Sequence, residues 1–468
     1  MHIRSEKHVN KRLQEALVTV ESEVVGRQEK QLWQSVLNKS NDYVWPVLSA
    51  ENEYASLLAH TQYFKRTSNA VKPSLENQEL VLNIMETVYG SIRTTMIDWF
   101  NFDNFKKVLF SLDFQSTPGY PYLFTAPTIG DYLKFNGDSF DSTRVSILWN
   151  DVNNIINDLD DEDIYWRTFI KQEPHKISKA QCNRWRLITC PPLSIQVLWQ
   201  MCFASQNRLE IDDSYNLPTQ QGIVMPYGGW KNYYQQWLSL GLACSTDMTA
   251  WDWTCPSWLI DMDLRFRKRL TNSDSLWLKM VDFLYNNAFY NCKIILSDGR
   301  VFRQLFPGII KSGCVNTIST NGHCQVMLHV MVCIDQSLRI DFPRVVGDDK
   351  LQSISHYALR SSYEKYGVII KSITDTMEFV GNQWTDNGPQ PMYTGKHVFN
   401  LLHASDENIV EIFDSYLRFY SYSDLRHFVR WLSKLYGVEN QLKSDQYYRY
   451  WYDNPNAKIL KDIVSNLT

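Results

Sequence analysis

The chain contains 468 residues, of which 44% are hydrophobic and 14% aromatic, and its formal net charge is −4. This hydrophobic content is enough for a substantial core, which excludes a chain that is disordered throughout. The net charge excludes a nucleic-acid binder with a uniformly basic surface, so contacts with a polyanion must come from local basic patches.

Nine cysteines occur without a CxxC pair, and their odd number argues against a closed disulfide framework. They show no metal-ligand spacing, and reduced thiols in a cytosolic compartment are the simplest interpretation. The N-terminal stretch MHIRSEKHVNKRLQEAL is polar and charged, so we expect no signal peptide. The apolar run VMLHVMVCI is too short to cross a bilayer, so we expect no transmembrane segment.

The first half of the chain predicts helices around a few strands. Residues 1–60 are predicted to be mostly helical, because apolar positions recur at helical spacing. The Gly/Pro-rich stretch STPGYPY, residues 116–122, predicts a loop. Residues 185–209 predict a short strand, a proline break and a helix, and residues 240–248 predict a buried strand in which Asp247 marks the end.

The second half continues with a helix over residues 255–270 and a hairpin centred on Ser297, Asp298 and Gly299. Residues 312–334 predict a long apolar helix after a glycine-bearing loop, and residues 344–354 predict a strand, a turn and a strand. A helix that leads into a strand follows over residues 361–372, and helices dominate after about residue 400. No clean linker separates these elements, which favours one interlocked α+β body.

Two adjacent carboxylates, Asp348 and Asp349, follow Gly347 between two apolar segments. Gly and Asp are ordinary residues of a solvated turn, which is one interpretation. Carboxylates this close raise each other's pKa unless a positive charge lies between them, and a metal site is the other interpretation. Asp247 would supply a third carboxylate if its strand lies beside this hairpin. For Asp247 alone, a helix N-cap is the alternative.

Asp252 follows Asp247 by five positions and lies just past the predicted strand, too far round from Asp247 to be an equal ligand of the metal. Thr317 and Asn321 lie four residues apart and share one face of the predicted helix. A carboxylate beside an amide can recognise a hydroxyl that donates and accepts, such as a ribose 2′-OH, so Asn321 is expected to meet Asp252. Interior hydrogen bonds of a buried helix are the alternative for Thr317 and Asn321.

Two segments are basic. The segment FIKQEPHKISKAQCNRWRLI combines a single Glu173 with five basic residues: Lys171, Lys176, Lys179, Arg184 and Arg186. Of these, Lys171, Lys179 and Arg186 are predicted to line a channel wall that binds phosphates, and a solvated helix face is the alternative. The segment LRFRKRL, residues 264–270, is interpreted as a solvated helix face.

In their order and spacing, these motifs resemble the palm and fingers motifs of viral RNA-dependent RNA polymerases. The shared patterns are D-x4-D (Asp247, Asp252), S-G-x3-T-x3-N (Ser312 to Asn321) and G-D-D (Gly347 to Asp349). The stretches KQEPH…K…RWRLI, AWDW and MEFVGNQW resemble the sobemovirus–polerovirus–barnavirus branch, and STPGYPY is similar to the template-entry motif of those enzymes. The resemblance covers about residues 116–400. Ala250 and Gly322 depart from it, because the family usually has Gly and often has Ser at these positions.

The resemblance implies a role for each matching residue. Asp247 and Asp348 would bind two Mg²⁺ or Mn²⁺ ions, with Asp349 as an auxiliary ligand. Lys371 would protonate the leaving pyrophosphate, with Lys365 as its rival. Nucleotide binding is implied for Lys171, Lys179, Arg184, Arg186, Asp252, Ser312, Thr317 and Asn321. Template binding is implied for Ser116, Thr117, Gly119 and Tyr120.

The resemblance also implies an α+β right-hand polymerase fold with an antiparallel palm sheet flanked by helices. Residues 1–185 would form the N-terminal region and fingers, 186–240 palm and fingers, 241–400 the palm with a fingers insertion near 265–305, and 401–468 the thumb. The expected partners are RNA template and product, ribonucleoside triphosphates and other viral replication proteins. The expected location is the host cytoplasm, at membrane-associated replication complexes.

Two other functions fit parts of the sequence. A reverse transcriptase would share the fold and the metals, but Asp252 with Asn321 favours ribonucleotides. A non-catalytic RNA-binding protein on a decayed polymerase scaffold would not need the three intact aspartates. The C-terminal aromatic residues leave two interpretations, stacking on a starting nucleotide or packing in the thumb core: Tyr447, Tyr448, Tyr450 and Trp451.

Overall fold

The computed structural model describes residues 6–23, 26–65, 70–159 and 163–455. Residues 1–5 of the predicted N-terminal helical region and residues 456–468 of the predicted thumb therefore lie outside the described residues.

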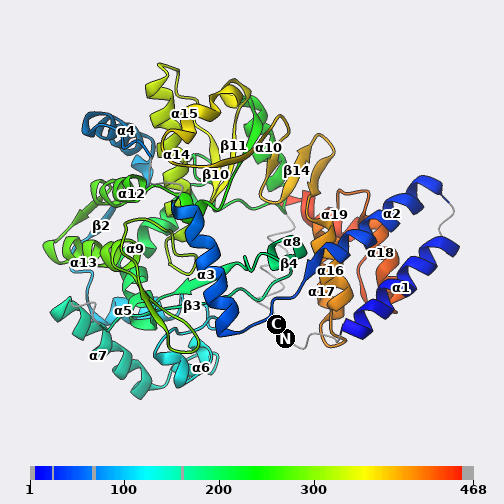
Figure 1. Cartoon of the computed structure of the whole chain (residues 1–468), viewed down its shortest axis with the longest axis horizontal. Helices are drawn as coiled ribbons and strands as arrows, with labels where there is room; N and C mark the ends of the chain where they lie inside the picture. The colour runs from blue at the N-terminus through cyan, green and yellow to red at the C-terminus, as the bar shows by residue number, and fades with distance from the viewer. Residues whose placement is uncertain (1–5, 24–25, 66–69, 160–162, 456–468) are drawn as a thin grey trace.

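The central sheet is antiparallel and has the strand order β10 (Arg344–Val346), β11 (Asp349–Ser353), β6 (Leu242–Met248) and β12 (Ile370–Thr374). Lys350 pairs with Thr246, and Ser372 pairs with Asp247. The hairpin between β10 and β11 closes at Gly347, where a φ of +60° favours glycine. Helices α14 (Thr317–Asp335) and α15 (Arg360–Glu364) lie beside this sheet (Figure 1). The predicted antiparallel sheet flanked by helices is therefore confirmed.

A second sheet has the order β5 (Leu187–Cys190), β3 (Trp166–Ile170), β8 (Lys293–Ile295) and β9 (Val301–Arg303). Strands β8 and β9 form the hairpin that the Ser-Asp-Gly sequence predicts. After β5, Pro191 and Pro192 break the chain before α9 (Leu193–Asp212), as the sequence also predicts.

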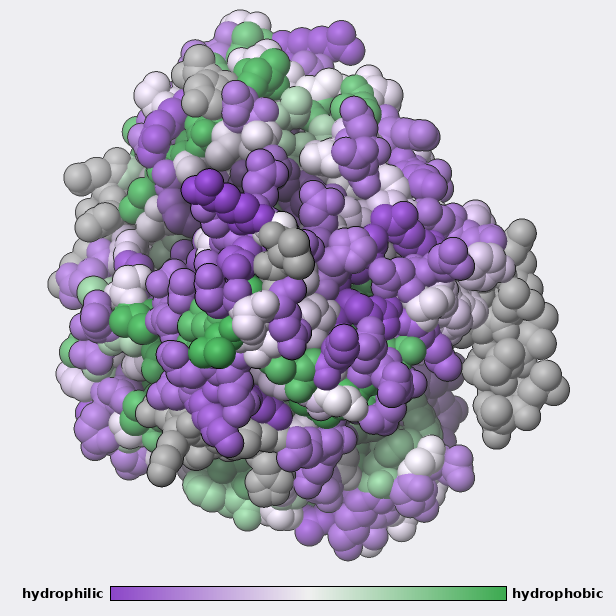
Figure 2. Space-filling view, turned by 90° about the vertical axis from the view of Figure 1, so that its right-hand side faces the viewer, coloured by the Kyte–Doolittle hydropathy of each residue, from purple (hydrophilic) through white to green (hydrophobic). Residues whose placement is uncertain are grey.

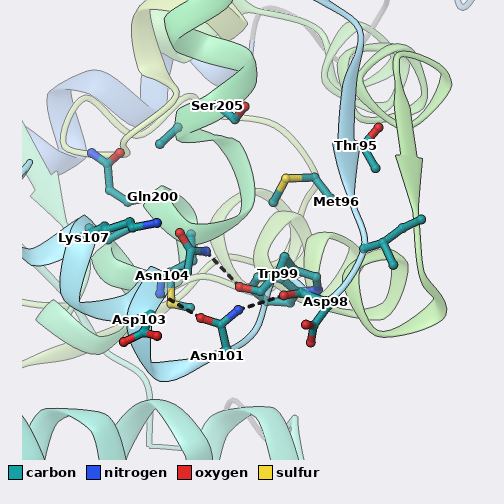
Figure 3. A pocket seen from close by; sticks show the side chains of 14 residues that line it. Thr95, Met96, Asp98, Trp99, Asn101, Asp103, Asn104, Lys107, Gln200 and Ser205 are labelled. Atoms are coloured by element: carbon teal, nitrogen blue, oxygen red, sulfur yellow. Dashed lines mark hydrogen bonds between the residues drawn. The ribbon is translucent and has the colours of Figure 1, made fainter.

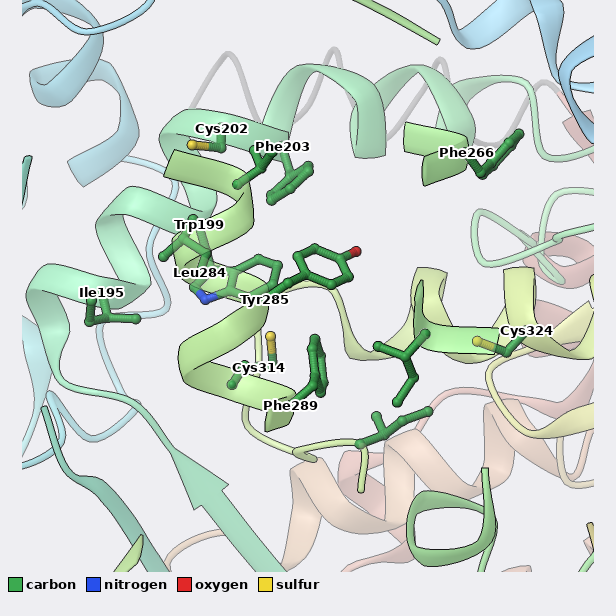
Figure 4. Packing of buried hydrophobic residues seen from close by; sticks show 14 of the residues in the cluster. Ile195, Trp199, Cys202, Phe203, Phe266, Leu284, Tyr285, Phe289, Cys314 and Cys324 are labelled. Atoms are coloured by element: carbon green, nitrogen blue, oxygen red, sulfur yellow. The ribbon is translucent and has the colours of Figure 1, made fainter. Parts of the chain in front are cut away.

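The main hydrophobic core lies among α9, α12 (Ser257–Arg269), α13 (Ser275–Tyr285) and α14. Trp199 and Phe203 of α9 pack against Tyr285 of α13 and Phe289 of the π-helical turn that follows it (Figure 4). The ring centroids of Trp199 and Tyr285 are 5.3 Å apart. These buried aromatic side chains hold the helices that support the central sheet.

A second core joins the two ends of the described chain. Helices α1 (Glu6–Glu23) and α2 (Arg27–Lys39) pack against α16 (Thr394–His403), α17 (Ile409–Phe419), α18 (Arg426–Leu435) and α19 (Asp445–Asp453) (Figure 1). The Arg12 guanidinium donates hydrogen bonds to the carbonyls of Leu402 and Ala404, at 3.0 and 2.9 Å. The predicted domain limits at residues 185, 240 and 400 stay predictions.

The remaining elements surround the two sheets. The helices are α3 (Ala50–Lys65), α4 (Leu75–Val88), α5 (Phe102–Leu109), α6 (Ile129–Leu133), α7 (Ser142–Asp158), α8 (Ile177–Ala180), α10 (Gly229–Ser239) and α11 (Trp251–Thr254). The strands are β1 (Tyr43–Val44), β2 (Thr94–Met96), β4 (His175–Lys176), β7 (Thr271–Ser273), β13 (Glu378–Phe379), β14 (Asn382–Thr385) and β15 (Gly388–Pro391).

The surface is largely hydrophilic on the face shown in Figure 2, with small separate hydrophobic patches. Among the described helices, none combines the length and the apolar character that a membrane span requires. The nine cysteines, all within the described residues, form no disulfide.

Candidate active site

The central sheet brings the three predicted carboxylates to one end of neighbouring strands. Asp247 lies next to the last residue of β6, and Asp348 and Asp349 lie at the tip of the β10–β11 hairpin. Because Lys350 pairs with Thr246 in an antiparallel ladder, the next position places Asp349 across from Asp247. All three side chains are exposed to solvent.

The electrostatics of this group suit a divalent cation. Although the side chains reach solvent, the surrounding protein desolvates them and raises the pKa of Asp348, and of Asp349 to about 6. The charges of Asp348 and Asp247 add to the rise at Asp349. A bound divalent cation would relieve this repulsion and favour the ionised carboxylates. Carboxylate oxygens are also the ligands that Mg²⁺ and Mn²⁺ prefer.

Lys371 and Lys365 are the two predicted candidates for the general acid, and they have different ion-pair partners in the structure. The Lys371 ammonium on β12 forms an ion pair with the Asp247 carboxylate. Lys365 instead pairs with Asp335 at the far end of α14. Of the two lysines, Lys371 is therefore the one beside the carboxylates.

Asp252 and Asn321 meet as the sequence predicts. The Asn321 amide donates to the Asp252 carboxylate at 3.4 Å, and its oxygen accepts from the indole of Trp251 at 3.0 Å. Burial and the nearby Asp348 charge raise the pKa of Asp252 to about 6. Asn321 sits near the start of α14, whereas Asp252 belongs to the short helix α11 that follows β6.

The hydroxyl groups of Ser312 and Thr317 donate hydrogen bonds to backbone carbonyls. Ser312 donates to the Leu187 carbonyl at 2.9 Å, and Thr317 donates to the carbonyls of Lys311 and Cys314 at 2.7 and 2.6 Å. The Gly313 N–H donates to the Thr189 carbonyl at 3.1 Å. These bonds attach the loop before α14 to β5, so the structure gives both hydroxyls a partner inside the protein.

In the basic segment, Glu173 is the centre of an ion-pair cluster that the sequence alone did not reveal. It accepts from Arg186 at 2.6 Å, and it lies 3.1 Å from the Lys396 ammonium and 3.5 Å from the Lys171 ammonium. Burial would raise the pKa of Glu173, but these three cations lower it to about 2. Lys396 belongs to α16, so no local sequence signal could identify it.

Two residues of the basic segment, Arg186 and Lys179, take part in the electrostatics of the site. Burial raises the pKa of Asp252 and of Asp348, and the Arg186 charge partly offsets both rises. Burial, followed by the charges of Arg184, Arg186 and Lys371, lowers the pKa of Lys179. A negatively charged ligand between this segment and the carboxylates would relieve the repulsion among these cations.

Arg184 points to a different neighbour, because its guanidinium bonds to the hydroxyl of Tyr63 on α3. In the second basic segment, Arg265 and Arg269 pair with Glu79 of α4. The interpretation of that segment as a solvated face is wrong for Arg267, which is fully buried and pairs with Asp263. A run of charged residues does not reveal which of its members is turned into the core.

The predicted template loop packs against the break between β5 and α9. Gly119 has a φ of +71°, and a Cβ there would lie 2.3 Å from the Pro191 carbonyl oxygen, so only glycine fits. The Thr117 carbonyl accepts from Gln196 at 3.3 Å, and the Ser116 hydroxyl donates to Asp113 at 2.6 Å. The Tyr120 ring packs edge-on against Phe124 and Tyr165.

The structure explains the departure at Gly322 and shows a cost for the departure at Ala250. Ala250 has a φ of +48°, a left-handed conformation that glycine adopts more easily. A Cβ on Gly322 would lie 2.8 Å from the Thr219 methyl group, which leaves no room for a serine side chain. Four residues after Asn321, Gln325 donates to the Asp348 carbonyl at 3.2 Å, a contact that this helical spacing could have indicated.

The C-terminal aromatic residues differ in how deeply they are buried. Tyr448 is buried in the second core and donates to Asp414 at 2.7 Å. Tyr447 contacts Trp451 at a centroid distance of 5.9 Å, whereas Tyr450 is 44% exposed. The packing interpretation therefore describes Tyr448 best.

A surface cavity of about 630 Å³ lies between β2, α5 and α9, away from the carboxylates (Figure 3). Its walls include Asp98, Asp103 and Lys107. The Asn101 and Asn104 side chains donate to the carbonyls of Asp98 and Trp99 at its edge. None of its lining residues belongs to the predicted site.

Comparisons with known proteins agree on one protein family. Residues 59–388 match the family model described as viral RNA-dependent RNA polymerase. Protein P1-P2 of Turnip yellows virus is 25% identical over 445 residues, which is 83% of this chain and 40% of that protein. The RNA-directed RNA polymerase of Mushroom bacilliform virus is 27% identical over 227 residues, 46% of this chain and 53% of that protein. The Replicase polyprotein P2AB of Southern bean mosaic virus is 30% identical over 176 residues, 36% of this chain and 18% of that protein.

A solved structure of a Sicinivirus 3Dpol RNA-dependent RNA polymerase superposes with a TM-score of 0.65 over 82% of this chain and 86% of that chain. Its sequence is 12% identical, so this match concerns the fold. Alignments to the P1-P2 proteins cover about two fifths of their length.

Proposed function

Because the chain belongs to the viral RNA-dependent RNA polymerase family, we propose that it adds ribonucleoside monophosphates to an RNA 3′ end under the direction of an RNA template. In this way it would replicate a viral RNA genome. The observation that carries the proposal is the register that sets Asp349 across from Asp247, with the hydrogen-bonded Asp252 and Asn321 beside them. The relatives come from the viruses of the predicted branch.

Asp247 and Asp348, with Asp349 as an auxiliary ligand, would hold two divalent cations, Mg²⁺ or Mn²⁺. When bound, such ions lower the pKa of the attacking 3′-hydroxyl and stabilise the charge of the phosphate transition state. Lys371 forms an ion pair with Asp247. From this position beside the carboxylates, its ammonium would donate a proton to the leaving pyrophosphate.

The nucleotide would lie between the carboxylates and the basic segment. Arg186 would bind phosphate oxygens bidentately, and Lys171 and Lys179 would add point charges. Asp252 and Asn321 would recognise the ribose 2′-OH. The contacts of Arg184, Ser312 and Thr317 suit them to supporting roles, in which they hold the walls of the site.

RNA would be the partner as template and product, and the loop with Ser116, Thr117, Gly119 and Tyr120 would guide the template strand. The template role is supported by the position of this loop: Gly119 fixes it against Pro191 at the break before α9, and the adjacent strand β5 holds the Ser312–Gly313 loop. Other replication proteins would place the enzyme at membrane-associated complexes in the host cytoplasm.

The test is an extension assay on a defined RNA, with and without a primer, in Mg²⁺ and in Mn²⁺. We expect templated incorporation of labelled UTP by the wild-type chain and loss of incorporation by Asp348→Ala. Asp138→Ala is the matched control, because Asp138 is an exposed aspartate in the loop before α7. Synthesis by Asp348→Ala at the wild-type rate would contradict the proposal and favour a non-catalytic RNA-binding protein.

The same assay separates this function from reverse transcription. On a poly(rA) template, the paired Asp252 and Asn321 predict a preference for UTP over TTP. A clear preference for TTP would overturn the choice of substrate.

A further inference from the structure

Three buried side chains behind the central sheet form a group that the polymerase reaction does not use. His329 and Cys333 lie one turn apart on α14, and His356 lies in the 3-10 helix Ile354–Leu359 that follows β11. Their exposures are 0%, 0% and 2%. Among the described residues, one ligand atom from each of these three lies within 4.8 Å of the others.

The distances suit a single zinc ion. Zinc binds thiolate at about 2.3 Å and imidazole at about 2.0 Å, so tetrahedral geometry separates sulfur and nitrogen ligands by about 3.5 Å. The Cys333 Sγ lies 3.5 Å from His329 Nε2 and 3.8 Å from His356 Nε2. Soft thiolate and imidazole ligands favour zinc over the hard cations that carboxylates prefer.

His329 also has a partner that can orient its ring. Its Nδ1 lies 2.6 Å from the Tyr363 hydroxyl, and its Nε2 lies 2.9 Å from the Asp341 carbonyl oxygen. If Nε2 binds an ion, Nδ1 carries the proton and donates it to Tyr363, whose hydroxyl in turn lies 3.5 Å from the Gln352 oxygen. A metal-ligating histidine commonly donates its second N–H in this way.

Lys350 supplies an independent observation. This side chain is 1% exposed, and its ammonium has no hydrogen-bond partner among the described residues. It lies 4.1 Å from the centroid of the Tyr363 ring, and its charge acts on His329, His356 and Cys333. Zinc deprotonates a thiol that coordinates it, and the resulting Cys333 thiolate would provide the negative charge that Lys350 lacks.

We propose that His329, Cys333 and His356 bind one zinc ion, with the Asp341 carbonyl oxygen or a water molecule as the fourth ligand. Lys350 follows Asp349 directly on β11, and successive strand residues point to opposite faces. The zinc ion therefore lies on the opposite face of the sheet from the Asp349 carboxylate. The ion connects α14 to the 3-10 helix that follows β11. It thereby fixes the helix that carries Asn321 and the strand that begins with Asp349.

The experiment measures zinc in the full chain, purified without a metal-affinity tag and dialysed against metal-free buffer. We expect about one zinc ion per wild-type chain by elemental analysis. The Cys333→Ser and His356→Gln variants are expected to lower zinc affinity at least about 100-fold in competition with a chromophoric chelator. Cys324→Ser is the matched control, because Cys324 is buried on the same helix outside the group, and it should keep the zinc.

Two further measurements keep the result interpretable. Co²⁺ added to the wild-type chain should give a thiolate-to-cobalt absorption band, a readout that needs no variant to fold. Asp348→Ala should keep its zinc, because the catalytic carboxylates are a separate site. Absence of zinc and of the cobalt band in the wild-type chain, or zinc retained at wild-type affinity by Cys333→Ser, would overturn the proposal.

Discussion

Lys371 on β12 forms an ion pair with Asp247 on β6, and the neighbouring Ser372 is the residue that pairs with Asp247 in the sheet. The proposed proton donor therefore sits on the strand adjacent to a proposed metal ligand. We predict that Lys371→Met lowers the rate of nucleotide addition about 100-fold, the usual contribution of a general acid. The nucleotide KM should change little, which single-turnover incorporation over a range of nucleotide concentrations will show.

Lys365→Met is the matched control, because Lys365 pairs with Asp335 on another part of the fold. Its incorporation rate should stay within about twofold of wild type, as expected for a residue without a part in proton transfer. A larger loss in Lys365→Met than in Lys371→Met would reverse the assignment.

Asn321 holds the Asp252 carboxylate and is predicted to discriminate ribose from deoxyribose. Asn321→Ala should reduce the ratio of kcat/KM for UTP over TTP about 10- to 30-fold, the value of one or two hydrogen bonds. Thr317→Val is the control, since the Thr317 hydroxyl bonds to backbone carbonyls. It should lower the free energy of unfolding by about 1 kcal/mol and leave the ratio unchanged. An unaltered ratio in Asn321→Ala would remove Asn321 from sugar recognition.

A buried cluster of charged side chains helps to hold α14 in place. His323 lies 3.0 Å from the Glu210 carboxylate and 2.6 Å from Asp263, which also pairs with Arg267. All four side chains are 0% exposed. We predict that Glu210→Gln lowers the free energy of unfolding by about 3–5 kcal/mol, because it leaves a buried cation short of a partner. Glu407→Gln, at an exposed position, is the control and should change it by less than about 0.5 kcal/mol in a urea titration.

The pH dependence of stability follows from the same cluster. Although burial opposes its charge, the two carboxylates raise the pKa of His323, so its contribution is complete below its unfolded value of about 6.5 and is lost as pH rises through the raised pKa. Glu210 and Asp263 have lowered pKa values, so their contribution is lost as pH falls below about 4. The unfolding midpoint of wild type should therefore fall on alkaline titration, and this part of the fall should be absent in His323→Gln.

Ala250 precedes α11 in a left-handed conformation that costs a non-glycine residue about 1–2 kcal/mol. Glycine removes this cost, but its more flexible unfolded chain offsets about 0.5–1 kcal/mol of the benefit. Ala250→Gly should therefore raise the free energy of unfolding by about 0.5–1 kcal/mol. Ala55→Gly, in the middle of α3, should instead lower it by about 1 kcal/mol. Chemical denaturation of both variants checks the opposite signs, and a loss of stability in Ala250→Gly would contradict the argument.

Local sequence patterns predicted the elements around the site. The apolar run that stops near Asp247, the Gly-Asp-Asp turn and the proline break after β5 each encode their structure within a few residues. The approach of Asp252 to Asn321 was also predictable, because motif order carries information about the whole fold.

Other features depend on partners far along the chain and could not be predicted in the same way. Lys396 reaches Glu173 from α16, and Arg267 points into the core from a segment that looks solvated. The third member of the histidine–cysteine group, His356, lies 23 residues after Cys333, so neither residue type nor spacing revealed it. The Thr317 hydroxyl bonds to the backbone carbonyls of Lys311 and Cys314, which a motif does not indicate.

The core shared by the two ends of the described chain has a consequence for biosynthesis. The carbonyl that Arg12 contacts on Leu402 belongs to a residue 390 positions later. At a synthesis rate of about 5–20 residues per second, the part of α1 that packs on α16 would stay uncovered for roughly 20–80 s, although α2 covers another part earlier. A nascent chain stopped before α16 would keep that part of the helix exposed.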